Sequence, residues 1–213
     1  MLIKKCLPFL FLLSLSASVF AQENHDDGIY PRIGIKGGLS IASIIKSDNP
    51  DISSQALLGF NGGAVLQLPL GKYIAIQPEV LFSQKGYHAS GNSLTGDYDY
   101  KRYSNFLDIP LLLRINLAKE FGLVVGPQYS YLLSTHTSFK SGGVNYQEDV
   151  NNDNSNITKN IFGGVIGADI NLNHNLFLYG RYTIDFKNNN GDGTSTTPSY
   201  KNQVFQFGLG VLL

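Results

Sequence analysis

The sequence predicts an all-β chain that folds as an eight-stranded antiparallel up-and-down transmembrane β-barrel. Three observations predict it. Segments of a dozen or so residues alternate apolar and polar side chains with a period of two. Such segments recur about eight times, and the connections between them are alternately short and long. Of the 213 residues, 23 are glycine, 12% are aromatic and only 15% are charged, a composition typical of β proteins rich in glycine and tyrosine.

The expected strands are long enough to cross a bilayer, because about twelve residues at ~3.3 Å each, tilted by ~40°, span close to 30 Å. The strands are expected at 31–45, 57–70, 73–87, 103–117, 121–134, 159–172, 175–187 and 202–213. Short turns are expected at 70–73, 118–120 and 173–174, and long polar connections at 46–56, 88–102, 135–158 and 188–201.

The stretch 107–116, LDIPLLLRIN, shows the alternation clearly. Its odd-numbered residues are apolar, whereas its even-numbered residues include Asp108, Pro110 and Arg114. In a soluble ligand-binding barrel, which is one alternative, the apolar face would line a pocket. We expect the inverse, with apolar side chains toward lipid, because the strands are long, the loops are asymmetric and aromatic residues gather near the rims. These are Phe82, Tyr103, Phe106, Tyr129, Tyr131, Tyr182 and Phe186 near the long loops, and Tyr30, Tyr73 and Phe121 near the short turns.

Three prolines fall inside expected strands, at Pro78, Pro110 and Pro127. Each lacks a backbone donor, so a bulge or a local break is expected beside each one. The barrel must still close, because an open strand edge in hydrocarbon would leave donors and acceptors unpaired.

The polar face predicts a charged lumen. An unpaired buried charge is very unfavourable, so the inward charges are expected to pair and to plug the narrow interior of an eight-stranded barrel. A narrow pore or a transport or secretion component is the alternative. The expected structural ionic cluster consists of Glu79, Asp108, Arg114, Asp169, Arg181 and Asp185.

The N-terminus has the pattern of a secretory signal peptide over residues 1–21: two lysines, a short apolar core and small residues before Ala21. We expect a short periplasmic leader at 22–30 and the barrel domain at 31–213, placed in a Gram-negative outer membrane after cleavage, with both chain ends in the periplasm. Cys6 would leave with the peptide. Removing Lys4 and Lys5 from the 16 basic residues leaves 14 against 16 acidic ones, a formal charge of −2, so no nucleic-acid partner is expected.

No catalytic site, cofactor site or metal site is predicted. His88 and Ser90, and likewise His136 and Ser138, form H-x-S patterns near the outer rim, which leaves a lipid A-modifying enzyme as a second alternative. The four histidines show no metal-ligand spacing. The stretches 188–193 and 148–154 resemble calcium loops only in part, since the first lacks the opening carboxylate and the second lacks the glycine.

Several segments together resemble the outer-membrane β-barrel proteins ("porin family", PorT-like) of Bacteroidetes. They are IGIKGGLS at 33–40, IQPEVLFSQKG at 76–86, FLDIPLLLRI at 106–115 and GPQYSYLL at 126–133. The resemblance implies an outer-membrane barrel of about eight strands. The ending Gly210-Val211-Leu212-Leu213 departs from it, because such barrels usually end in an aromatic residue that the assembly machinery reads.

The expected role is structural, or one of surface recognition through the long extracellular loops, since loops on a rigid scaffold commonly carry recognition. The expected partners are outer-membrane lipid, the barrel-assembly machinery, and an extracellular ligand or protein. The loops expected to contact such a partner are 135–158 and 188–201.

Overall fold

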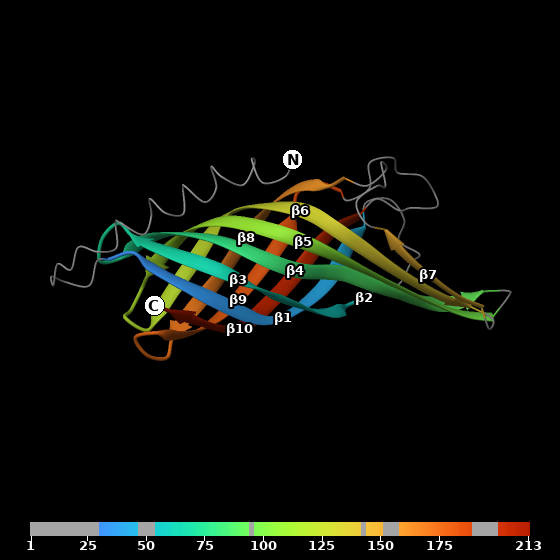
Figure 1. The fold of residues 1–213 in the computed structure, drawn as a ribbon, viewed down its shortest axis with the longest axis horizontal. Helices are drawn as coiled ribbons and strands as arrows, with labels where there is room; N and C mark the ends of the chain where they lie inside the picture. Colours follow the sequence, from blue (N-terminus) through green and yellow to red (C-terminus); the bar gives the residue numbers. More distant parts are fainter. Residues whose placement is uncertain (1–29, 47–53, 94–95, 142–143, 151–157, 189–199) are drawn as a thin grey trace, which may run out of the picture.

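The computed structural model describes residues 30–46, 54–93, 96–141, 144–150, 158–188 and 200–213, which build one antiparallel β-barrel (Figure 1). Among these residues, no helix is both long and apolar enough to cross a membrane. The strands are β1 (Arg32–Lys46), β2 (Ser54–Gln55), β3 (Leu57–Pro69), β4 (Ile74–Ser93), β5 (Gly96–Asn116), β6 (Phe121–Ser141), β7 (Val144–Val150), β8 (Asn160–Asn171), β9 (Leu176–Asp185) and β10 (Tyr200–Leu212).

Eight of these strands close into a ring. Around it, β4, β3, β1, β10, β9, β8, β6 and β5 pair in turn, and the pairing of β4 with β5 completes the circle. All of these pairs are antiparallel. The two further strands lie outside the ring, with β2 beside β4 and β7 beside β6. The predicted eight-stranded antiparallel barrel is therefore confirmed.

The apolar face of the strands points outward. On β5 the side chain of Leu111 is 53% exposed, whereas its neighbours Leu112 and Pro110 are buried, at 1% for Leu112. The same alternation runs along β9 and β10, where Phe205 and Phe207 are exposed and Gln206 is buried. A continuous apolar belt of this kind is far larger than the surface patches of soluble monomers and matches the lipid-facing band of a membrane barrel.

The strand pairing is interrupted beside the prolines. The β4–β5 ladder stops at Pro78 and resumes at Leu81, across from Pro110, with the register unchanged. The β5–β6 ladder has a similar gap across from Pro127. The expected local breaks are confirmed, and their cause is the missing proline N–H. The register shift in the β5–β6 ladder lies elsewhere, between Asn105 and Phe106.

Three strands are much longer than expected. β4, β5 and β6 contain 20, 21 and 21 residues, and Figure 1 shows them running well past the other strands at one end of the molecule. The segments 88–102 and 135–158 were expected as loops, but the first is mostly the β4–β5 hairpin and the second holds the end of β6 and all of β7. The alternation of apolar and polar residues did not predict these strand extensions, because a strand outside the membrane does not need an apolar face.

Aromatic residues ring the outer surface, as expected, with one correction. Phe60 stacks on Phe82, and Tyr182 packs against Phe205, with ring centroids 5.3 and 4.8 Å apart. Phe106, expected in this girdle, is instead buried in a cluster with Leu132 and Ile161. It is one residue from the outward-facing Leu107, so alternation turns it inward.

Candidate functional site in the lumen

All six predicted lumenal residues lie inside the barrel with buried side chains. The structure brings Glu79, Arg114, Asp169 and Arg181 into one group, here called the lower cluster, near the short turns. Lys36 on β1 belongs to it as well. The upper cluster, nearer the long hairpins, consists of Lys85, Asp108 and Asp185.

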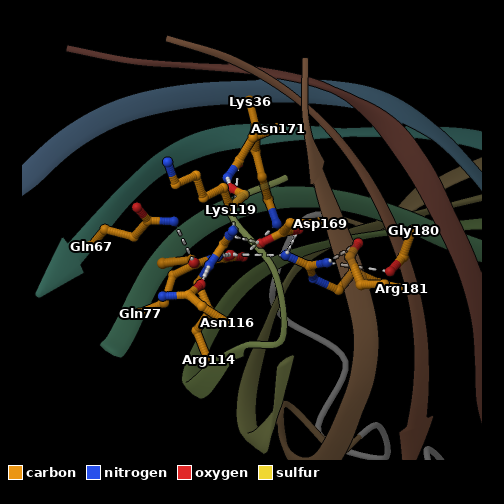
Figure 2. Close-up of polar contacts among 12 residues, drawn as sticks. Lys36, Gln67, Gln77, Arg114, Asn116, Lys119, Asp169, Asn171, Gly180 and Arg181 are labelled. Atoms are coloured by element: carbon orange, nitrogen blue, oxygen red, sulfur yellow. Dashed lines mark hydrogen bonds and ion pairs between the residues drawn. The ribbon is translucent and has the colours of Figure 1, made fainter. Parts of the chain in front are cut away.

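In the lower cluster, Asp169 on β8 lies between two arginines. Figure 2 shows Arg114 and Arg181 approaching its carboxylate from opposite sides. Arg114 Nη1 is 2.5 Å from Asp169 Oδ2, and Arg181 Nη2 is 2.6 Å from Asp169 Oδ1. Glu79 accepts a hydrogen bond of 2.5 Å from Lys36 Nζ and lies 3.8 Å from Arg181 Nη2. Arg181 therefore links the two acidic groups.

The upper cluster is organised around Lys85 on β4. Its ammonium donates to Asp108 Oδ1 and to Ser130 Oγ, each at 3.1 Å, and lies 4.0 Å from Asp185 Oδ1. It also lies 4.7 Å from the ring centroid of Phe106. The second carboxylate is held by Asn202, which donates to Asp185 Oδ2 at 2.8 Å. Every charged group of this cluster thus has a polar partner.

Two of these ion pairs cross the barrel. In the ring of eight strands, β4 and β9 are separated by three strands in either direction, so they form opposite walls. Arg181 on β9 reaches Glu79 on β4 in the lower cluster, and Lys85 on β4 reaches Asp185 on β9 in the upper cluster. The lumen is therefore spanned by side chains at two heights.

Uncharged groups fill the space around and between the clusters. Gln77 donates to Glu79 Oε1 at 2.8 Å, and Gln206 donates to Ser83 Oγ at 3.1 Å. Buried apolar groups gather in two further places, with Ile44, Tyr87 and Tyr200 in one cluster and Val65, Phe177, Tyr179 and Leu212 in the other. The two ionic clusters together have four basic and four acidic groups and are formally neutral. Each charged group has an ionic partner, although Asp108 Oδ2 and Arg181 Nε are buried without a hydrogen-bond partner in the described part of the chain.

Glycines make room for large lumenal side chains. A Cβ at Gly122 would stand 2.9 Å from Arg114 Nε, and one at Gly210 would stand 2.2 Å from Phe177 Cζ. Both glycines face the interior, where a guanidinium and a ring occupy the space that a side chain would take. The position of Arg114 in the lower cluster therefore depends on Gly122, and the position of Phe177 in its apolar cluster depends on Gly210.

Sequence reasoning left two lysines out of the predicted cluster. Lys85 follows Gln77, Glu79 and Ser83 on the inward face of β4, so alternation alone places it in the lumen. Lys36 alternates with the exposed Ile35 on β1 in the same way. The alternation that identified the acidic residues was thus sufficient to find both lysines.

Near the outer rim, His88 is hydrogen-bonded to an aspartate, a contact that the H-x-S pattern did not predict. His88 Nε2 lies 2.9 Å from Asp99 Oδ2, a pair between β4 and β5 above the barrel. This hydrogen bond, with the nearby charges of His88 and Lys101, holds the pKa of the Asp99 carboxyl below its usual range. The side chain of Ser90 lies outside the described residues, while His136 and Ser138 share one face of β6.

No metal centre is formed by the described side chains, since no three His, Cys, Asp or Glu residues among them are arranged to hold an ion. The calcium-like stretches at 188–193 and 148–154 fall largely outside the described residues.

Comparison with solved structures gives the same fold. Neisserial surface protein A aligns with a TM-score of 0.51 at 13% identity, covering 84% of this chain and 96% of that one. The attachment invasion locus protein Ail of Yersinia pestis aligns at 0.44 and 14% identity, covering 86% and 97%. Outer membrane protein W of E. coli aligns at 0.44 and 13% identity, covering 88% and 100%. No curated protein matches the sequence.

The sequence itself matches a family model over most of its length. The model, described as an outer membrane protein beta-barrel domain, matches residues 20–191. The closed eight-stranded ring, the apolar outer belt and the polar lumen are the features that such a domain needs in an outer membrane. The chain belongs to the family of outer membrane protein β-barrel domains.

Proposed function

We propose that this protein is a plugged outer-membrane scaffold that presents a β-sheet for recognition at the cell surface. The observation that carries the proposal is the continuation of β4, β5 and β6 beyond the barrel, with β7 added at the edge. At ~3.3 Å per residue and a tilt of ~40°, strands of this length rise to about 50 Å, roughly twice the ~25 Å apolar band of such barrels. We call the part above the rim, made of these four strands, the blade.

The blade is built on one side of the barrel only. β8, β9 and β10 contain 12, 10 and 13 residues, which is enough to cross the membrane and little more. A sheet raised on one wall is not needed to close the ring or to cover the lumen. It offers a β-sheet surface and, along β7, an edge whose outer side has no paired strand among the described residues, the kind of feature that binds extended peptides or other partners.

The contacts inside the lumen favour a structural scaffold over a pore. The opposite walls β4 and β9 are joined by ion pairs at two heights, and the charges of the two clusters balance when they are taken together. Moving an ion through the interior would require breaking buried pairs, each of which resists loss of one partner by about 3–5 kcal/mol. In planar bilayers the protein should therefore show no steps of conductance, and a steady open channel would support the pore instead.

The recognition role is tested by removing the blade and keeping the barrel. A variant in which residues 88–101 and residues 134–157 are each replaced by an Asn-Gly turn should still fold and migrate as a folded barrel before heating. Each protein is placed in a nanodisc of neutral lipid and applied to an array of extracellular proteins and glycans. The full-length protein should give binding signals that the shortened variant does not give. Replacing the turn 118–120 by Asn-Gly provides the control at the other rim. Signals that survive in the shortened variant would contradict the proposal.

We also propose that the protein is not an enzyme. Its His88 side chain is engaged by Asp99, and the pair lies in a solvent-facing hairpin rather than in an enclosed site. Replacing both His88 and His136 by alanine should leave the lipid A composition of the host cells unchanged by mass spectrometry. A loss of one acyl chain that depends on either histidine would establish the lipid-modifying alternative.

The proposal also includes the subfamily of the barrel and the processing of its N-terminus. The order of the segments at 33–40, 76–86, 106–115 and 126–133 supports a PorT-like barrel of the Bacteroidetes type. Cleavage after Ala21 and delivery to the barrel-assembly machinery would follow. N-terminal sequencing of the protein from an outer-membrane fraction tests the cleavage site directly.

A further inference from the structure

The short-turn end of the barrel contains a cavity of about 370 Å³, here called the vestibule. It is formed where the start of β1, the β3–β4 turn, the β5–β6 turn and the end of β8 meet. Four of its lining residues are basic, namely Arg32, Lys72, Arg114 and Lys119, and none is acidic. This end is opposite the blade, so the vestibule is unrelated to the surface proposed for recognition.

The positive charge of the vestibule is only partly balanced. Arg114 is paired with Asp169, which lies deeper in the lumen. Among the described residues, no carboxylate lies within ion-pair distance of Arg32, Lys72 or Lys119. Arg32 donates to the backbone carbonyls of His174 and Leu212, and its Nε is buried without a hydrogen-bond partner. Within the described part of the chain, three cationic side chains therefore line one small cavity without a carboxylate that pairs with them.

Hydrogen bonds hold the walls of the vestibule in place. Asn171 Nδ2 donates to the carbonyl of Lys119 at 2.9 Å, and Asn171 N–H donates to the carbonyl of Glu120 at 2.7 Å, which ties the β5–β6 turn to β8. Asn116 Oδ1 accepts from Arg114 Nε at 2.8 Å. Its own amide nitrogen has no acceptor among the described residues. The exposed carboxylate of Glu120 is not among the lining groups.

We propose that the vestibule binds a phosphate group, as a phosphomonoester or a diphosphate. A single carboxylate would balance one of the three cations, whereas a phosphate with two charges and three free oxygens can accept from several donors at once. The volume is within the range of small-molecule sites. The floor is closed by the lower cluster, so the anion binds at the mouth and does not pass through.

A phosphate group can reach this rim from two sources. One is a free phosphoester in the periplasm, toward which the short turns of such barrels face. The other is the headgroup of a phospholipid beside the rim, where Tyr73 and Lys72 are both exposed. Both sources present the same chemistry to the vestibule, so the test must use both.

The test measures binding by isothermal titration calorimetry in a neutral maltoside detergent. The protein used is the chain from Gln22 onward, so that the acidic residues within 22–29 are present. The probes are inorganic pyrophosphate and a short-chain phosphatidic acid. We expect saturable binding of at least one probe, weakened roughly tenfold or more in the double variant Lys72→Gln/Lys119→Gln and weakened further by added salt. Binding of pyrophosphate alone assigns the free source, and binding of the lipid alone assigns the headgroup.

The matched control is Lys187→Gln, which removes an exposed lysine at the opposite rim and should change the affinity less than about twofold. Neither charge variant alters the buried pairs, so both should fold, as checked by migration of the unheated protein. The proposal is wrong if neither probe binds, if the double variant binds the probe as tightly as the unmodified chain, or if Lys187→Gln weakens binding as much as the double variant does.

Discussion

At the scale of single residues, Arg181 links the two carboxylates of the lower cluster. Its guanidinium contacts Asp169 on the adjacent strand β8 and Glu79 on the opposite wall, and it donates to the backbone carbonyl of Ala168 at 2.9 Å. Removing it would leave Lys36 and Arg114 to balance both carboxylates. The penalty is the desolvation of charges that lose a partner, which exceeds the net gain of the pair itself.

We therefore expect Arg181→Met to lower the free energy of unfolding by about 1–3 kcal/mol, because each carboxylate loses one donor but keeps one cation. The measurement is urea-induced unfolding in neutral lipid vesicles. Adding Glu79→Gln to this variant should increase the loss further, because the buried ammonium of Lys36 would then lose its carboxylate partner. The control Lys187→Gln should stay within about 0.5 kcal/mol of the parent. Parent-like stability of Arg181→Met would show that the cluster is not needed to hold the walls together.

Gly122 offers a test of the space around Arg114. The alanine Cβ would come within 2.9 Å of Arg114 Nε and Nη2, which donate to Asn116 and Asn171. We expect Gly122→Ala to cost about 1–3 kcal/mol in the same urea assay, as overpacking does. Gly180→Ala is the matched control, since nothing lies within 4 Å of that Cβ. Equal effects of the two substitutions would mean that Arg114 adjusts freely.

At the scale of elements, the β4–β5 hairpin above the barrel is joined by the His88–Asp99 pair. The pKa of the Asp99 carboxyl is lowered in the folded protein, first by the hydrogen bond from His88 and then by the charges of His88 and Lys101. A lowered pKa means that folding favours the ionised form. The pair therefore stabilises the hairpin above the ordinary pKa of 3.8, and this contribution is lost as the pH falls through the lowered value.

Replacing His88 by alanine should raise the pKa of Asp99 toward its ordinary value. Carboxyl carbon chemical shifts in a pH titration of the labelled protein report it directly. The variant Lys101→Gln should raise the same pKa by less, because that ammonium is 3.7 Å away and half exposed. A pKa for Asp99 that does not move in the His88 variant would show that the hydrogen bond is absent in solution.

The strands also show which parts of the fold the alternation of apolar and polar residues can predict. The membrane-crossing parts of all eight strands were predicted because lipid outside and water-free space inside impose opposite demands on neighbouring residues. The blade was missed because Asn, Ser and Gly, which are frequent in these segments, are common in loops as well. Strand identity there depends on the hydrogen bonds of neighbouring strands.

At the scale of the whole molecule, the residues that face the lumen could be predicted, but their partners could not. Alternation placed Arg114, Asp169 and Arg181 on inward faces of three strands, and it did the same for the overlooked Lys36. It could not show that Arg181 meets Asp169 and Glu79 rather than Asp185. Which residues share a height depends on the tilt and stagger of the strands around the ring, which are properties of the closed barrel.

The orientation of the strands determines every other feature described above, from the ionic lumen to the apolar belt. The chain from Gln22 onward contains no cysteine, so single cysteines can be labelled at chosen sites without background. Neighbouring positions on β5 offer a matched pair, since the side chain of Leu111 is exposed and that of Leu112 is buried in the lumen.

The most direct test reconstitutes Leu111→Cys and Leu112→Cys, each carrying a small fluorophore, in bilayers whose acyl chains bear brominated quenchers. Quenching should be strong at position 111 and weak at position 112, with the same alternation at Leu113→Cys. Strong quenching at 112 and weak quenching at 111 would contradict the account, because it would place the apolar residues inside the barrel and the charges against lipid.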